Sequence, residues 1–196
     1  MSAEFNPSEI IKILDVKREV KDKLKSFFDD FSTDLLLSQD IFLSGGCFAS
    51  LLQGETPKDY DVYFKLEDVA TRLCHLYTLP QLKEKVAVIE EKYRDVEGHP
   101  SGLCITENAM TLKSGIQLIK KHYGSPEEIR KTFDFVHCMP YYDPFIDKLY
   151  ISRQQYDCCV KKYLVVNSIG NYTPLRESKF KMRGYIYDGK YETQLS

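Results

Sequence analysis

Two aspartates, Asp59 and Asp61, lie two residues apart in a segment whose other face carries Tyr60, Val62 and Phe64. Alternate side chains of a strand point to the same face, so we expect the two carboxylates to project together. Carboxylates this close repel each other unless a cation lies between them, and Mg²⁺ (or Mn²⁺) is an oxygen-seeking cation that also binds substrate phosphates. The pair therefore predicts a metal site, of the kind in which two ions about 3.5 to 4 Å apart serve phosphoryl chemistry.

A Gly-Gly pair precedes the aspartates, where a predicted strand (39–44) turns into a predicted helix (47–53). The free backbone N–H groups and positive dipole of such a helix start suit a triphosphate. Glycine also lets phosphate oxygens approach the backbone closely. The candidate phosphate contacts at this turn are Ser44, Gly45, Gly46 and Lys58. The ordinary alternative is a solvated Asp-x-Asp beside a plain glycine turn, and the spacing of the two motifs favours the site.

The run 45–64 resembles the nucleotidyltransferase superfamily of DNA polymerase beta. It is most similar to the head domain of poly(A) polymerases and tRNA nucleotidyltransferases, where Gly-Gly leads to Leu-Leu-Gly and then Pro-Lys-Asp-x-Asp. The matching segments here are Gly45-Gly46, Leu51-Leu52-Gln53-Gly54 and Pro57-Lys58-Asp59-Tyr60-Asp61. The resemblance implies an α/β (α+β) nucleotidyltransferase fold with a mixed sheet flanked by helices. It also implies transfer of a nucleoside monophosphate from an NTP, such as ATP, to a hydroxyl acceptor, with an RNA 3′ end as the first acceptor to consider.

The chain departs from that subfamily at two places. Ala49-Ser50 replaces an Arg-Asp pair, and Thr132-Phe133 replaces two arginines that precede Asp134 in the similar Arg-Arg-Asp-Phe-Thr strand. Asp134 fits the third acidic position of the wider superfamily, on a strand beside the first two. There it would be the base on the acceptor hydroxyl or a further metal ligand, although the subfamily places this aspartate near the ribose. A turn-forming aspartate at the start of an apolar strand is the structural alternative.

These departures leave other functions open. The chain lacks the Glu-Asp-x-x-Arg signature and the long helical body of tRNA nucleotidyltransferases. One alternative is a binding or regulatory module that keeps the fold without turnover, and another is a toxin-like enzyme that modifies a protein or a small molecule. Segments 106–113, 133–137 and 179–185 also resemble uncharacterised nucleotidyltransferase-like proteins of large tailed bacteriophages, which suggests a viral origin.

Composition limits the partners. The 196 residues, 43% of them hydrophobic, fit one domain, and a net charge of −2 provides no global attraction to nucleic acid, so any RNA contact must be local. No apolar run approaches 18 residues and no signal peptide is recognisable, so we expect a cytoplasmic protein without a membrane partner. The six cysteines should be reduced, and neither Cys74-His75 nor His137-Cys138 has a second pair at zinc-ligand spacing.

The elements that would position these residues follow from periodicity and caps. We expect an N-terminal helical segment (1–35) on a nucleotidyltransferase core (36–152), with a C-terminal helical extension (153–196). The core should contain strands 39–44 and 59–65, a helix 66–77, a helix 80–93 with 86–89 as a possible strand, a loop 94–102, a hairpin of 108–112 and 116–119, and a helix capped by Ser125. The extension should contain helices over 153–166 and from Pro174 onward.

Arg176, Lys179 and Arg183 are spaced by three and four residues in the last predicted helix. This spacing would place them on one face, where they would bind the triphosphate or an RNA backbone. A solvated face balanced by Glu177 is the alternative.

Overall fold

The structure, a computed structural model, describes residues 4–29, 38–87, 104–168 and 173–187. A six-stranded mixed sheet, in the order β3-β4-β2-β1-β5-β6, forms its centre. The strands are β1 (Ile41–Ser44), β2 (Tyr60–Phe64), β3 (Ala109–Thr111), β4 (Ile116–Tyr123), β5 (Tyr141–Asp143) and β6 (Lys148–Tyr150). A second, two-stranded sheet pairs β7 (Tyr163–Leu164) with β8 (Ile186–Tyr187). The predicted fold class, a mixed sheet flanked by helices, is confirmed.

Strand register brings three polar side chains together in the middle of the sheet. β2 is antiparallel to β1 and parallel to β4, so Asp61 lies opposite Ser44 on one side and Gln117 on the other. Antiparallel pairing of β3 with β4 then places Thr111 opposite Gln117.

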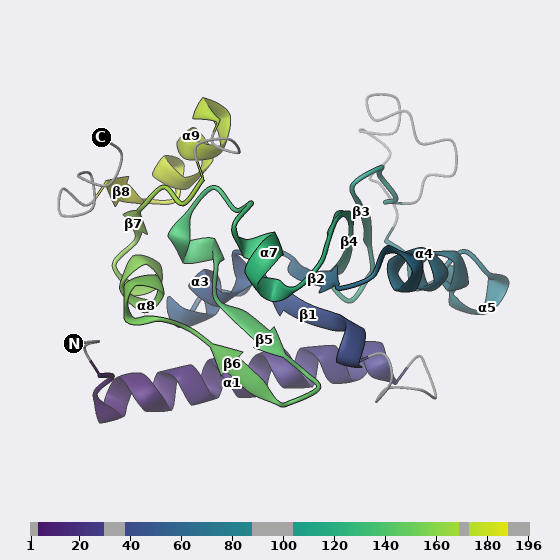
Figure 1. The fold of residues 1–196 in the computed structure, drawn as a ribbon, viewed down its shortest axis with the longest axis horizontal. Coiled ribbons are helices and arrows are strands. Elements are labelled where there is room, and N and C mark those ends of the chain that lie inside the picture. Colours follow the sequence, from purple (N-terminus) through teal and green to yellow (C-terminus); the bar gives the residue numbers. More distant parts are fainter. Residues whose placement is uncertain (1–3, 30–37, 88–103, 169–172, 188–196) are drawn as a thin grey trace.

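The helices surround this sheet (Figure 1). They are α1 (Pro7–Phe28), α3 (Cys47–Leu52), α4 (Glu67–Leu76), α5 (Pro80–Lys83), α7 (Pro126–Arg130), the 3₁₀ turn η2 (Val136–Cys138), α8 (Arg153–Val160) and α9 (Pro174–Met182). The long helix α1 begins with a capping box between Asn6 and Glu9, and its buried residues Val16, Val20 and Leu24 join the main hydrophobic core. Figure 1 shows α1 and α9 at opposite sides of the molecule. Among the described residues, no helix is both long and apolar enough to cross a membrane.

Several predicted elements need correction at their ends. The helix expected over 80–93 is helical only for Pro80–Lys83, after which Val86 bridges to Leu112, and 88–93 lies outside the described residues. The helix expected over 153–166 ends at Val160, because the following residues pair with β8. The predicted loop 94–102 also lies outside the described residues.

The strand predicted to carry Asp134 is wrong. The Asp134 carbonyl accepts a hydrogen bond from the Asn167 N–H (2.8 Å), and Phe135 bridges to Val166, so this segment pairs outside the main sheet. The chain then makes the η2 turn, and the strand that pairs with β1 begins only at Tyr141. Pro140 has no N–H to donate to a ladder, which is consistent with the strand starting after it.

Candidate active site

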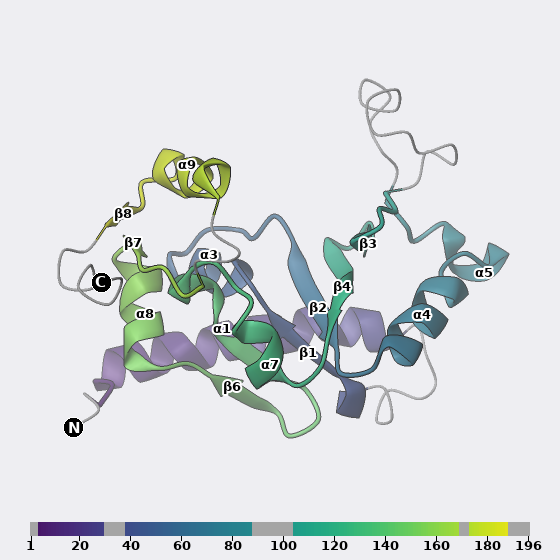
Figure 2. The ribbon, with the colours of Figure 1, turned by 45° about the horizontal axis from the view of Figure 1, so that its top comes forward.

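A cleft of about 410 Å³ opens where β1, β2 and β4 meet the segments around α7 and α9. Figure 2 shows α9 and the β3–β4 hairpin rising on either side of β2. The lining residues are Gly45, Gly46, Asp61, Tyr63, Asn108, Ala109, Gln117, Ile119, Lys121, His122, Thr132, Phe133, Asp134, Cys138 and Arg176. The glycine pair, one aspartate of the Asp-x-Asp motif, Asp134 and Arg176 thus share one cleft, although they lie up to 131 residues apart in the sequence.

The position of the Asp61 side chain requires a glycine at residue 45. It adopts φ +106°, and a Cβ at this position would lie 2.7 Å from Oδ2 of Asp61. Its N–H donates to the Cys138 carbonyl (3.1 Å). The absence of a side chain at Gly45 therefore makes room for the Asp61 carboxylate, and its amide is already engaged within the protein.

Gly46 has different surroundings. It precedes the first residue of α3 with ordinary helical φ, and a Cβ built on it would meet nothing within 4 Å. Among the predicted phosphate contacts at this turn, Gly46 is the one whose backbone faces open space in the cleft.

The other two predicted contacts at this turn do not line the cleft. Ser44 is fully buried and its hydroxyl donates to the Pro140 carbonyl (2.8 Å), so it lies behind the glycine pair. Lys58 is exposed and precedes β2, outside the lining. Because the Ser44 hydroxyl is turned into the protein, we correct its assignment as a phosphate contact.

The charge state of Asp61 reflects its enclosure. Burial, and then the neighbouring charge of Asp59, raise the pKa of Asp61 to about 7, while Lys179 and Arg176 act in the opposite direction. No described residue forms a hydrogen bond or ion pair with the Asp61 carboxylate. Two carboxylates two residues apart, of which Asp61 has no hydrogen bond or ion pair to a described residue, form a donor set that fits a divalent ion such as Mg²⁺ or Mn²⁺.

Asp134 does not complete a three-acid cluster. Among the described residues, no group of three His, Cys, Asp or Glu side chains could hold a metal ion. The buried Asp134 carboxylate is instead bound by the Arg176 guanidinium, through Nε and through Nη2 (3.3 Å), and accepts the Phe135 N–H (3.1 Å). The structure thus places Asp134 in the cleft as the partner of an arginine, apart from Asp59 and Asp61, and this corrects its assignment as a metal ligand.

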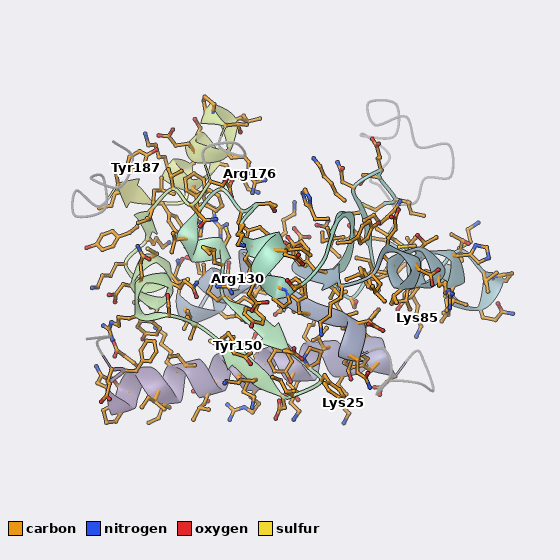
Figure 3. All side chains as sticks on the ribbon, viewed as in Figure 1. Lys25, Lys85, Arg130, Tyr150, Arg176 and Tyr187 are labelled. Atoms are coloured by element: carbon orange, nitrogen blue, oxygen red, sulfur yellow. The ribbon has the colours of Figure 1, made fainter. Side chains whose placement is uncertain are left out.

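The three cations predicted to share one face of the last helix have separate partners. Arg176, labelled on α9 in Figure 3, binds Asp134 and lines the cleft, and the charge of Lys179 reaches Asp61. Arg183 follows the helix, and its Nη2 donates to Ser50 Oγ on α3 (3.1 Å). Arg176 and Lys179 can therefore serve the cleft, whereas Arg183 ties the end of α9 to α3.

Sequence reasoning missed the wall of the cleft that β4 provides. Gln117, Ile119 and Lys121 alternate along this strand and all face the cleft. The signal was present, because residues two apart on the predicted hairpin strand must share a face. What the sequence did not reveal was the parallel pairing that sets this face beside Asp61.

A model of one protein family, described as Gabija anti-defense 2 (Gad2) family protein, matches residues 18–160. The chain belongs to the Gad2 family. The match extends from α1 to α8 and so includes the glycine pair, Asp59, Asp61 and Asp134, but ends before α9. No curated protein matches the chain.

Solved structures of CCA-adding enzymes resemble this Gad2 family member in fold. A CCA-adding enzyme in complex with CTP has a TM-score of 0.51 at 15% identity, over 95% of this chain and 40% of that one. A tRNA-processing enzyme in its apo form has a TM-score of 0.50 at 14% identity, over 98% of this chain and 47% of that one. The chain spans less than half the length of these proteins, and at such identities the likeness shows the fold.

Proposed function

We propose that this Gad2 family protein is a metal-dependent nucleotidyltransferase that moves a nucleoside monophosphate from an NTP to a hydroxyl acceptor. The observation that carries the proposal is the meeting of Asp61, Gly46 and Arg176 in one cleft, because it combines a carboxylate without a partner among the described residues, a glycine with open space where a side chain would be, and a cation. These are the groups that nucleotidyl transfer requires around a triphosphate.

In this proposal each group has a role. Asp59 and Asp61 hold Mg²⁺ or Mn²⁺, which when bound lowers the pKa of the attacking hydroxyl and neutralises charge on the departing pyrophosphate. Gly46 lets the triphosphate approach the backbone at the start of α3, and Lys179, whose charge acts on Asp61, adds positive charge. Arg176 orients Asp134, whose carboxylate then lies in the cleft as a hydrogen-bond acceptor for the ribose or the acceptor hydroxyl.

The family description suggests the setting of the reaction. A Gabija anti-defense protein would act against that defence, so Gabija components, as well as RNA 3′ ends, are the acceptors to test. We further propose a viral origin and action in the host cytoplasm, because an anti-defence protein benefits an invader of the cell. Of the solved neighbours, one is described as a tRNA-processing enzyme and one as bound to CTP, which supports RNA and NTP as partners to test first.

A second candidate function is a module that binds nucleotide without turnover. It is favoured by one observation: Asp134 is committed to Arg176, so among the described residues no third carboxylate joins Asp59 and Asp61.

Label transfer distinguishes the two functions. The full chain is incubated with Mg²⁺ or Mn²⁺, each NTP labelled at the α-phosphate, and separately with total RNA, purified Gabija components and small hydroxyl compounds. We expect label in one acceptor class with the wild type and none with the Asp59→Asn, Asp61→Asn double variant. Asp22→Asn, an exposed aspartate on α1, is the charge-matched control and should transfer normally. Nucleotide binding without label in any acceptor would support the second function, and equal labelling by the double variant would refute the first.

A further inference from the structure

Gln117 lies beside the proposed metal-binding carboxylates, on a different strand. It is the parallel partner of Asp61 across the β2–β4 pair, and both side chains line the cleft. Neighbouring strands lie about 4.8 Å apart, and paired residues that line the same cleft share one face of the sheet. An amide from β4 therefore stands directly next to the carboxylate of Asp61.

A hydrogen bond fixes which end of this amide remains available. Nε2 of Gln117 donates to Oγ1 of Thr111 on β3 (3.0 Å), on the side of β4 opposite to Asp61. No described residue donates a hydrogen bond to Oε1. The amide nitrogen is thus held toward β3 by one of its two N–H groups, and the oxygen is the atom left for the cleft.

The surroundings of this oxygen require a positive partner. The carboxylates of Asp59 and Asp61 and Oε1 of Gln117 are all hydrogen-bond acceptors, and no described residue donates a hydrogen bond to Oε1 or to the Asp61 carboxylate. Arg176 directs its donors to Asp134, so it reaches Asp61 only through the field of its charge. A cluster of oxygens without a donor is stabilised by a metal cation, and carbonyl and carboxylate oxygens suit Mg²⁺ and Mn²⁺.

We propose that Oε1 of Gln117 is the third protein oxygen ligand of the cation held by Asp59 and Asp61, and that Thr111 is its positioning residue. This inference rests on the proposed function, because it assumes the same cation site. Since an amide is neutral, the site has the negative charge of two carboxylates. Metal affinity in the absence of nucleotide is therefore modest, and the phosphates of the NTP supply the remaining ligands.

The test is Mn²⁺ binding to the full chain without nucleotide, measured by electron paramagnetic resonance of free Mn²⁺ at pH 8. Gln117→Leu should weaken Mn²⁺ binding about tenfold, and Thr111→Val should weaken it in the same direction, since loss of an orienting partner costs about tenfold or more. Thr111→Ser keeps the hydroxyl and should restore wild-type affinity. Gln117→Glu, which adds a third carboxylate, should tighten binding. Gln81→Leu, the same change at an exposed position of α5, should have no effect.

The outcomes separate this inference from the proposed function. Wild-type Mn²⁺ affinity in Gln117→Leu, together with its loss in Asp61→Asn, would overturn the role of Gln117 and leave the two-carboxylate site standing. Wild-type affinity in both variants would show that the cleft holds no cation and would overturn both. If circular dichroism shows that Gln117→Leu does not fold, Gln117→Glu and the pair Thr111→Val and Thr111→Ser test the proposal instead. Unchanged affinity in all three of these variants would refute the proposal.

Discussion

His137 is buried beneath α9 in a cage of aromatic rings, and replacing it by phenylalanine should stabilise the protein. Its ring centroid lies 4.4 Å from those of Phe180 and Tyr185 and 5.6 Å from that of Phe135. Neither ring nitrogen has a hydrogen-bond partner within the described part of the chain. A buried polar group without a partner costs about 1 to 3 kcal/mol, so His137→Phe should raise the free energy of unfolding at pH 7.5 by about 1 to 2 kcal/mol, after a small cost for the larger ring.

The effect should grow in acid. Burial, and then the charges of Arg183 and Arg176, lower the pKa of His137 to about 3, whereas an unfolded histidine titrates near 6.5. Between these pH values the unfolded state binds a proton that the folded state does not, so stability is lost as the pH falls below 6.5. At pH 5 this removes about 2 kcal/mol from the wild type relative to pH 7.5, and this amount depends mainly on the unfolded pKa.

Urea unfolding of both proteins at pH 7.5 and pH 5 measures these quantities. The difference in unfolding free energy between variant and wild type should increase by about 2 kcal/mol on going to pH 5, because contributions from all other groups cancel in the comparison. If the difference in unfolding free energy between variant and wild type is the same at both pH values, His137 is not a buried, neutral imidazole. A variant less stable than the wild type at pH 7.5 would show that the ring nitrogens have partners.

Four further predictions concern the cleft. Asp61→Asn should stabilise the metal-free protein, measured by urea unfolding in chelator at pH 5 and 8. Burial and a neighbouring carboxylate raise the pKa of Asp61 in the folded protein to about 7, so the wild type loses stability as the pH rises from about 4 to 7. Equal stabilities of variant and wild type at pH 8 would contradict this prediction. Gly45→Ala should cost about 1 to 3 kcal/mol in thermal unfolding, because its Cβ would meet Asp61 at positive φ. Gly46→Val should keep the melting temperature but lose nucleotide binding in calorimetry, and wild-type affinity would show that this turn does not face phosphate. Arg176→Ala should destabilise the protein by about 3 kcal/mol because it leaves Asp134 buried without its cation. Adding Asp134→Asn should recover much of this loss. A double variant with the same unfolding free energy as Arg176→Ala would refute the assigned pairing.

Local signals in the sequence predicted most of the fold. The helix capped by Ser125 and the β3–β4 hairpin lie where the sequence placed them, since each depends on residues only a few positions apart. The structure also places the Gly-Gly motif (Gly45 and Gly46) in one cleft with Asp61 of the Asp-x-Asp motif.

The errors arose where distant segments decide the geometry. Asp134 lies in an alternating apolar segment that is typical of a strand, but its backbone pairs with Asn167 and its carboxylate with Arg176, 42 residues away. Ser44 follows a strand in the sequence as a phosphate contact would, yet its hydroxyl is bonded to Pro140. Pairings over such separations leave no local pattern, so periodicity and caps cannot predict them.

The same long-range contacts bear on whether the protein is a catalyst. The arginines expected near Asp134 and the cation expected on α3 are absent from the local sequence, which favoured an inactive module. In the folded chain, however, Arg176 of α9 binds Asp134, and Arg183, which follows α9, donates to Ser50, so a guanidinium group lies at each place. A module without a bound cation would also be more stable without the buried carboxyl group of Asp61. The raised pKa of Asp61 shows that its ionisation is unfavourable in the folded protein, and a bound metal ion would offset this cost. The retained carboxylate and the cations supplied by α9 therefore both favour the metal-dependent enzyme over the inactive module.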